Sequence, residues 1–218
     1  MSDKSNKFGY VGADIPAQSF QSNKGVFNPA EINELVADNK WTQYGQLELI
    51  ETVVADDTVT SYDFDNLGDY NVHFFTANDI TSDNTTAQNL DIRVKVGGSV
   101  QSSNYQFAQQ LGSTKSGGSF SESKSTSFAQ FIWVPNVDFE TNGTSQGYQY
   151  IYNALDSSKY TFGTFHCVTK QALNTPRFTF GSNVYTVANQ CSGFRVFLAT
   201  SGNITGGTIS LYGIKEYS

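Results

Sequence analysis

Apolar and polar residues alternate along much of the chain from about residue 43 onward. The clearest case is residues 89–96, where every second position is apolar and Asp91, Arg93 and Lys95 occupy three of the others. A period of two is typical of a strand with one buried face. The pattern therefore predicts that Leu90 and the apolar residues after it point inward, and that the three charged residues point outward.

Similar stretches recur, separated by turn-forming residues. They predict further strands at residues 46–54, 59–64, 70–76, 128–135, 147–153, 161–169, 177–180 with 184–187, and 194–199. Between them we expect a polar loop at residues 77–88 and a flexible serine- and glycine-rich loop at residues 112–127. About ten strands at this spacing predict an all-β fold, an antiparallel jelly-roll-like sandwich.

The last strand is expected to insert between strands made much earlier in the chain. After a predicted turn at residues 203–207, Ile209 and Leu211 face one way, while Ser210 and Tyr212 face the other. Gly213 interrupts this row, as glycine does at a bulge or where another group approaches the backbone closely.

One helix is predicted, and it begins at Pro29. Asn28 is a favoured N-cap, Pro29 suits the first helical position, and Glu31 completes a capping box. Its apolar stripe consists of Ile32, Leu35 and Val36. The helix should end near residues 38–40.

Residues 1–27 read as an extended arm with scattered apolar groups. These groups are Phe8, Tyr10, Val11, Ile15 and Phe20. They lack helical spacing and cannot form a core of their own, so we expect them to lie on the chain's own sandwich or on a neighbouring subunit. The predicted division is residues 1–42 for the arm and helix and residues 43–218 for the sandwich.

Composition and charge narrow the function classes. The 218 residues include 17 Phe, 12 Tyr and 19 Gly, which favours strands and turns. A net charge of −7 argues against a nucleic-acid partner, which needs a basic surface. The chain shows neither an apolar run for a signal peptide nor one for membrane insertion, so we expect a soluble protein made in a cytoplasm. Cys167 and Cys191 are expected to be buried free thiols.

Candidate chemistry is sparse. His73 and His166 lie in separate predicted strands, which favours structural roles over metal binding. Residues 63–69 begin like an EF-hand loop, but Phe74 occupies the place of the closing Glu. A solvated turn is the favoured interpretation, and an irregular calcium site using Asp63, Asp65 or Asp69 stays open. The sequence contains no nucleophile motif. Its acidic residues Glu48, Glu51, Asp138 and Glu140 show no spacing that marks a catalytic carboxylate pair. We therefore expect no enzyme activity, catalytic residue, cofactor or metal.

Three tyrosines form the most distinctive candidate surface. Tyr148, Tyr150 and Tyr152 share one face of a predicted strand. Such a row could stack on sugar rings as a glycan platform. It could equally pack against the other sheet or form an interface with a neighbouring subunit, and this second interpretation is favoured because interfaces are enriched in aromatic residues.

Two segments carry a family resemblance. Residues 206–215 read Gly-Gly-Thr-Ile-Ser-Leu-Tyr-Gly-Ile-Lys, and Gly-Val-Phe-Asn-Pro-Ala-Glu-Ile at residues 25–32 runs on to Lys40 and Trp41. In this order they resemble motifs of bacteriophage virion proteins, especially tail- and fibre-associated or capsid-decorating β-sandwich proteins of marine phages.

The resemblance implies a non-enzymatic structural protein of the virion, made in the host cytoplasm. Its partners would be other virion proteins and further copies of itself, and the arm at residues 1–27 would mediate docking. The alternative is a lectin-like adhesin in which the tyrosine row binds a host surface glycan.

Overall fold

The computed structural model describes residues 29–37, 47–56, 58–84, 86, 88–114, 120–137, 143–171 and 175–215. The chain divides into two compact units, Met1–Gly45 and Gln46–Ser218, and each is described by itself. The predicted docking residues Phe8, Tyr10, Val11, Ile15 and Phe20 lie outside the described residues.

The first unit contains the helix α1, Pro29–Ala37. It begins at the proline that the sequence places in the first helical position, where the missing backbone N–H removes no hydrogen bond. The prediction of a helix here is confirmed, with an end one residue earlier than expected. No described helix is long and apolar enough to cross a membrane.

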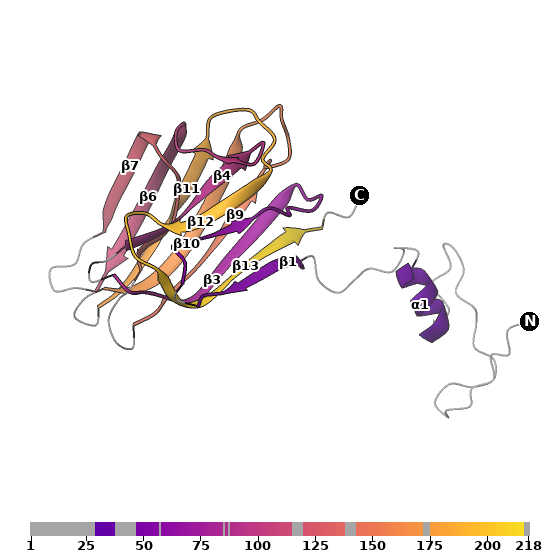
Figure 1. Ribbon diagram of the computed structural model, residues 1–218, viewed down its shortest axis with the longest axis horizontal. Coiled ribbons are helices and arrows are strands. Elements are labelled where there is room, and N and C mark those ends of the chain that lie inside the picture. The colour runs from indigo at the N-terminus through magenta and orange to yellow at the C-terminus, as the bar shows by residue number, and fades with distance from the viewer. Residues whose placement is uncertain are drawn as a thin grey trace, which may run out of the picture. The chain divides into compact units, whose positions relative to one another are not determined.

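The larger layer of the second unit is an eight-stranded antiparallel sheet (Figure 1). Its strands are β1 (Leu47–Val54), β3 (Val72–Ser82), β6 (Tyr105–Ser113), β7 (Ser121–Phe128), β9 (Ser145–Tyr152), β10 (Thr161–Gln171), β11 (Thr175–Tyr185) and β13 (Ile204–Ile214). They lie in the order β1-β13-β3-β9-β10-β11-β6-β7, so β1 and β7 form the two edges.

The smaller layer covers one face of this sheet. It consists of β2 (Ser61–Phe64), β4 (Gln88–Val96), β5 (Ser99–Val100), β8 (Phe131–Val137) and β12 (Gly193–Leu198). The order is β2-β12-β4-β5, and β8 pairs with the first half of β4. Every pairing in both layers is antiparallel, which confirms the predicted antiparallel sandwich.

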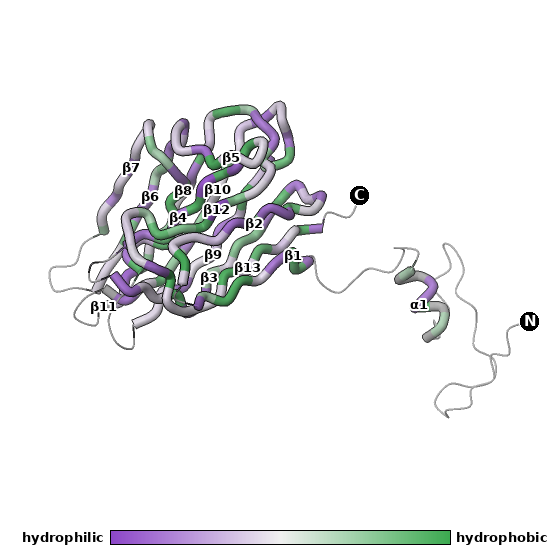
Figure 2. Tube along the Cα trace, viewed as in Figure 1, coloured by the Kyte–Doolittle hydropathy of each residue, from purple (hydrophilic) through white to green (hydrophobic). Residues whose placement is uncertain are grey.

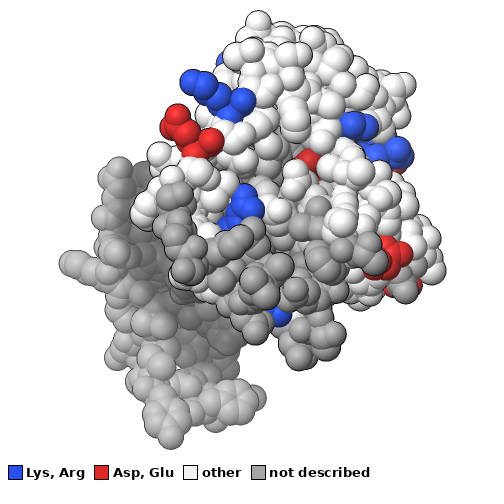
Figure 3. Space-filling view, turned by 90° about the vertical axis from the view of Figure 1, so that its left-hand side faces the viewer, with Lys and Arg blue, Asp and Glu red and all other residues white. Residues whose placement is uncertain are grey.

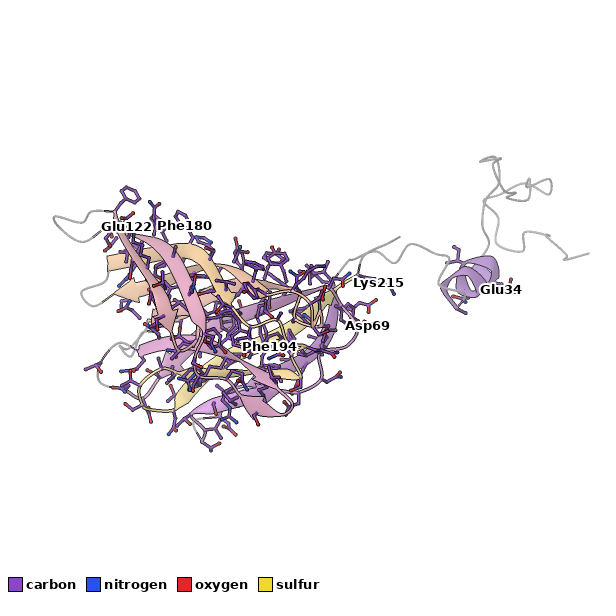
Figure 4. All side chains as sticks on the ribbon, turned by 90° about the horizontal axis from the view of Figure 1, so that it is seen from above. Glu34, Asp69, Glu122, Phe180, Phe194 and Lys215 are labelled. Atoms are coloured by element: carbon purple, nitrogen blue, oxygen red, sulfur yellow. The ribbon has the colours of Figure 1, made fainter. Side chains whose placement is uncertain are left out.

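Aromatic side chains fill the space between the layers. Phe75 of β3 is fully buried, with its ring centroid 5.7 Å from that of Trp133 on β8 and 5.5 Å from that of Phe194 on β12. Both contacts are edge to face, the arrangement that aromatic quadrupoles favour. Figure 4 shows Phe194 between the two layers. Hydropathy alternates along the strands that flank this core (Figure 2).

The last strand lies where the sequence predicts. β13 pairs with β1 on one side and with β3 on the other, with Ile209 and Leu211 buried in the core. A Cβ at Gly213 would overlap the ring of Tyr70, so this glycine permits a close approach, as expected. The predicted turn at residues 203–207 is wrong, because β13 already begins at Ile204. Two register shifts there absorb the glycines without ending the strand.

Two predicted loops are partly strand. The predicted loop at residues 77–88 is wrong in its first half, because β3 continues to Ser82. A bulge between Ala77 and Ile80, where Asp79 has a φ of 57°, turns Ile80 into the core despite the polar sequence around it. The described part of the predicted loop at 112–127 contains β7, which pairs with β6, a strand that the sequence pattern did not reveal.

Candidate functional site: the outer face of the eight-stranded sheet

The tyrosine row lies on the side of the large sheet that faces away from the core. Tyr148 is 41% exposed, whereas Gln149 and Ile151, its alternating neighbours on β9, are fully buried. The predicted common face for Tyr148, Tyr150 and Tyr152 is therefore confirmed. Packing of this row against the other sheet is excluded, because that sheet covers the opposite face.

Cross-strand register extends the row into a wider aromatic cluster. Phe74 on β3 lies opposite Tyr150 on β9 and opposite Tyr212 on β13. Its ring centroid is 4.6 Å from that of Tyr150, 6.0 Å from that of Tyr148 and 6.1 Å from that of Tyr212. On the other side, the Tyr148 ring contacts His166 of β10 edge to face at 5.6 Å. Such direct cross-strand pairs stabilise a sheet face.

A second aromatic group continues the surface on β11. Phe178 and Phe180 stack with ring centroids 6.3 Å apart and planes 6° apart. Phe178 reaches over β6 because residue 112 is glycine: a Cβ there would come within 2.6 Å of the Phe178 ring. Phe180 is 45% exposed and projects from the outer surface near β7 (Figure 4). Phe162 on β10 is 46% exposed.

Three hollows lie along β6 and β11 within this surface. Their volumes are about 390, 410 and 450 Å³. The second and third hollows share Ala108, Lys124 and Ser182, so they adjoin. Aromatic rings form walls and neutral polar groups lie beside them: the lining includes Phe120, Phe178, Phe180, Tyr152, Phe162, Gln106, Gln110, Thr164 and Ser182.

We call the outer side chains of β13, β3, β9, β10 and β11 described above the aromatic face. It comprises Phe74, Tyr148, Tyr150, Tyr152, Phe162, His166, Phe178, Phe180 and Tyr212. Permanent charges lie at its margins: Glu122 and Lys124 of β7 line one hollow, Arg177 lines another, and Lys170 lies near the end of β10. The side of the sandwich that carries β7 shows mostly uncharged atoms among the described residues, with a few acidic and basic groups scattered between them (Figure 3). An uncharged aromatic surface offers stacking and burial rather than ionic recognition.

His73, Cys167 and Cys191 contribute no reactive group to this face. His73 is fully buried and its Nε2 lies 2.9 Å from the carbonyl oxygen of Leu67, while burial lowers the pKa of its imidazole. Cys167 and Cys191 are buried free thiols, as expected. Burial raises the pKa of Cys167 to about 12, so it is not a thiolate near neutral pH. The described residues contain no group of three or more His, Cys, Asp or Glu that could hold a metal.

An ion-pair network lies at the start of the acidic turn. Asp63 accepts hydrogen bonds from Arg195, at 2.6 Å from Nε and 2.7 Å from Nη2. Lys95 Nζ lies 3.1 Å from Asp63 and also pairs with Asp65. Hydrogen bonding by Arg195 lowers the pKa of Asp63. The predicted solvated turn is therefore confirmed in part: Asp65 and Asp69 are exposed, whereas Asp63 belongs to β2 and is paired with basic residues of β12 and β4.

Sequence reasoning found part of the aromatic face and missed the rest. Phe178 and Phe180 alternate in the sequence as the tyrosines do, so the same criterion could have identified them. Their proximity to β6, and that of Phe74 to Tyr150, depends on strand order, which alternation alone does not give. Asp138 and Glu140 lie outside the described residues. No family model, no curated protein and no solved structure matches the chain.

Proposed function

We propose that the protein is a non-enzymatic assembly protein that binds its neighbours through the aromatic face. The sequence resemblance supplies the setting: a structural component of a bacteriophage virion, tail- or fibre-associated or capsid-decorating, made in the host cytoplasm. Its partners are then other virion proteins and further copies of this chain.

The observation that supports this proposal is the uncharged aromatic surface spread over five adjacent strands. Tyr148 and Phe180 are 41% and 45% exposed on strands whose opposite faces form the core. Aromatic residues gain the most from desolvation at an interface, and tyrosine tolerates a half-wet site because its hydroxyl still finds a partner. A sheet face facing only water would more commonly carry polar residues at these positions.

Incorporation into particles tests the proposal. Particles assembled with Tyr150→Ala should contain less of the protein than particles assembled with the wild type, because the variant removes the ring at the centre of the cluster. Tyr160→Ala is the matched control, since Tyr160 is 47% exposed but lies in the loop between β9 and β10. Equal incorporation of both variants, or absence of the wild type from particles, would contradict the proposal.

A second candidate function is binding of a neutral glycan on the same sheet. The three hollows support it, because aromatic walls offer faces on which sugar rings stack, and Gln110, Thr164 and Ser182 offer neutral hydrogen-bonding groups. Apart from Lys170 near the end of β10, the outer positions of β9 and β10 carry no permanent charge, which suits an uncharged ligand better than an acidic one.

A glycan array followed by titration of any ligand found tests this candidate. Phe180→Ala and Tyr150→Ala should each weaken binding by about tenfold or more, which corresponds to about 1.4 kcal/mol. Tyr160→Ala should leave it unchanged. Failure of the wild type to bind any glycan would remove this candidate and leave the assembly proposal standing.

A further inference from the structure

The strand β1 forms one edge of the large sheet as far as the structure describes the chain. Within the part of the chain that the structure describes, β1 pairs only with β13, and Ala55 directly after it also donates to Gly207 on that side. Three of its side chains are exposed apolar groups: Leu47 is 49%, Leu49 60% and Val54 68% exposed. A long apolar edge strand is a ready template for pairing with another chain.

The opposite edge shows how this fold protects an edge that stays unpaired. β7 carries Glu122 and Lys124 among serines and is exposed along most of its length, and Figure 2 colours it mostly pale to purple. Charged edge residues, lysine above all, oppose edge-to-edge pairing. Among the described edges of the smaller layer, β2 has four residues and β5 has two, while β8, which pairs only with β4, is buried along almost its whole length. β1 is thus the long described edge without such protection.

The charges of β1 do not oppose pairing. Its two acidic residues are Glu48 and Glu51. Glu48 is already occupied: Tyr70 Oη donates to it, and Lys215 Nζ lies 3.0 Å from Oε1. Hydrogen bonds from these two residues lower the pKa of Glu48, so it stays ionised and neutralised by Lys215.

From this edge we infer that β1 pairs with β1 of a second copy, antiparallel, about a two-fold axis between Ile50 and Glu51. In this register Leu47 lies opposite Val54 of the second copy, and Leu49 lies opposite Thr52. All four are exposed on the outer side. Each Glu then faces an apolar residue, Val53 or Ile50, so like charges never oppose each other.

The bulge in β1 fits this register. The register between β1 and β13 shifts between Leu49 and Glu51. The outward residues are therefore odd-numbered before the bulge and even-numbered after it, and this change falls at the proposed axis. Shifting the register by one residue would set outward Leu47 against Val53, which packs toward the core. The proposed register is the one that joins outward residues to outward residues on both sides of the bulge.

We assign the partner of this edge to a second copy of the chain, because the contact is self-complementary and gives a closed, isologous dimer. It would also extend the aromatic face. Leu49 lies opposite Tyr212, and Tyr212 lies opposite Phe74. Pairing two β1 strands therefore joins the outer surfaces of two eight-stranded sheets into one and presents two aromatic faces together, which raises avidity for any repeated partner.

Sedimentation or light scattering of the full chain over a range of concentrations tests the dimer. The wild type should form dimers. Leu49→Lys should raise the dissociation constant by about tenfold or more, because it places a charge on the paired edge. The matched control is Ser123→Lys on β7, which should leave the dissociation constant unchanged. A monomeric wild type, or a dimer that Leu49→Lys does not weaken, would overturn the inference.

Cysteine crosslinking tests the register and remains decisive if the lysine variant folds poorly. Leu49→Cys combined with Thr52→Cys should give a covalent dimer on oxidation, because the two positions face each other between copies. Within one strand they are three residues, about 10 Å, apart, too far for a disulfide. Leu49→Cys alone should not crosslink, and the native thiols Cys167 and Cys191 are buried. Failure of the double variant to crosslink would overturn the proposed register.

Discussion

At the scale of single residues, the largest departure from expectation is the burial of Asp91. Alternation correctly predicts that it points away from Leu90 and Ile92, yet it is fully buried. Gln130 Nε2 donates to its Oδ2 at 3.0 Å, and the backbone N–H of Trp133 donates to Oδ1 at 3.3 Å. Arg93 in turn donates to Gln130. Residues about forty positions away cover this carboxyl, and a two-residue period contains no information about them.

Burial raises the pKa of Asp91 to about 7, against a value near 3.9 in an unfolded chain. The folded state therefore holds a proton that the unfolded state has lost between about pH 4 and pH 7. The contribution of Asp91 to the free energy of unfolding therefore falls as pH rises through that window and is constant above it. Between pH 5 and pH 8 the change is about 2–3 kcal/mol. Asp91→Asn should remove this pH dependence, as measured by denaturant unfolding of both proteins at the two pH values.

The comparison with Asp91→Asn is necessary because His73 acts in the opposite direction. Burial lowers the pKa of His73, so its contribution to stability is lost as pH falls below about 6.5. That effect is common to wild type and variant and cancels in the difference. Identical pH profiles for the two proteins would show that Asp91 does not titrate as its burial requires.

At the scale of elements, strands with a clear apolar alternation were predictable and strands held by pairing alone were not. The bounds of β4, β9 and β10 lie within two residues of the predicted ones. β7 has the sequence Ser-Glu-Ser-Lys-Ser-Thr-Ser-Phe, which lacks any buried face to recognise. It is a strand because β6 supplies a ladder of hydrogen-bonding partners, a tertiary effect that overrides local composition.

The weak local preference of β7 predicts fast hydrogen exchange. Its amides should exchange at least about tenfold faster than those of β10, which lies between β9 and β11. Native-state exchange read by NMR or mass spectrometry measures both strands in one sample. β1 provides an internal comparison: as the other edge it should resemble β7 in a monomer and be slower in a dimer paired through β1. Protection of β7 equal to that of β10 would contradict this account of the strand.

At the scale of the whole molecule, the fold class followed from the sequence and the strand order did not. The number and spacing of strand signals predicted an antiparallel sandwich, because buried faces leave their period in the chain. The aromatic face depends on β3, β9 and β13 lying side by side, although β13 is more than a hundred residues from β3. The tyrosine row could therefore be proposed as a site, while its partners Phe74 and Tyr212 could not.

Truncation tests how the two units of the chain divide their roles. The aromatic core and all thirteen described strands belong to the unit Gln46–Ser218. A chain starting at Asn28 should therefore keep its β-sheet circular dichroism and melt within a few degrees of the full chain. It should nevertheless fail to enter particles, because the apolar groups Phe8, Tyr10, Val11, Ile15 and Phe20 gain stability only on a surface already folded, which must offset the entropy of ordering them.

The oligomeric state of the shortened chain separates this role from the edge contact. It retains β1, so pairing through that strand should survive while docking is lost. An unfolded shortened chain would mean that the arm is an intrinsic part of the sandwich. If it folds and still enters particles normally, attachment resides on the sandwich surface. The aromatic face then carries the docking as well, and Tyr150→Ala in the shortened chain should abolish incorporation, because no second contact remains to hold the protein on the particle.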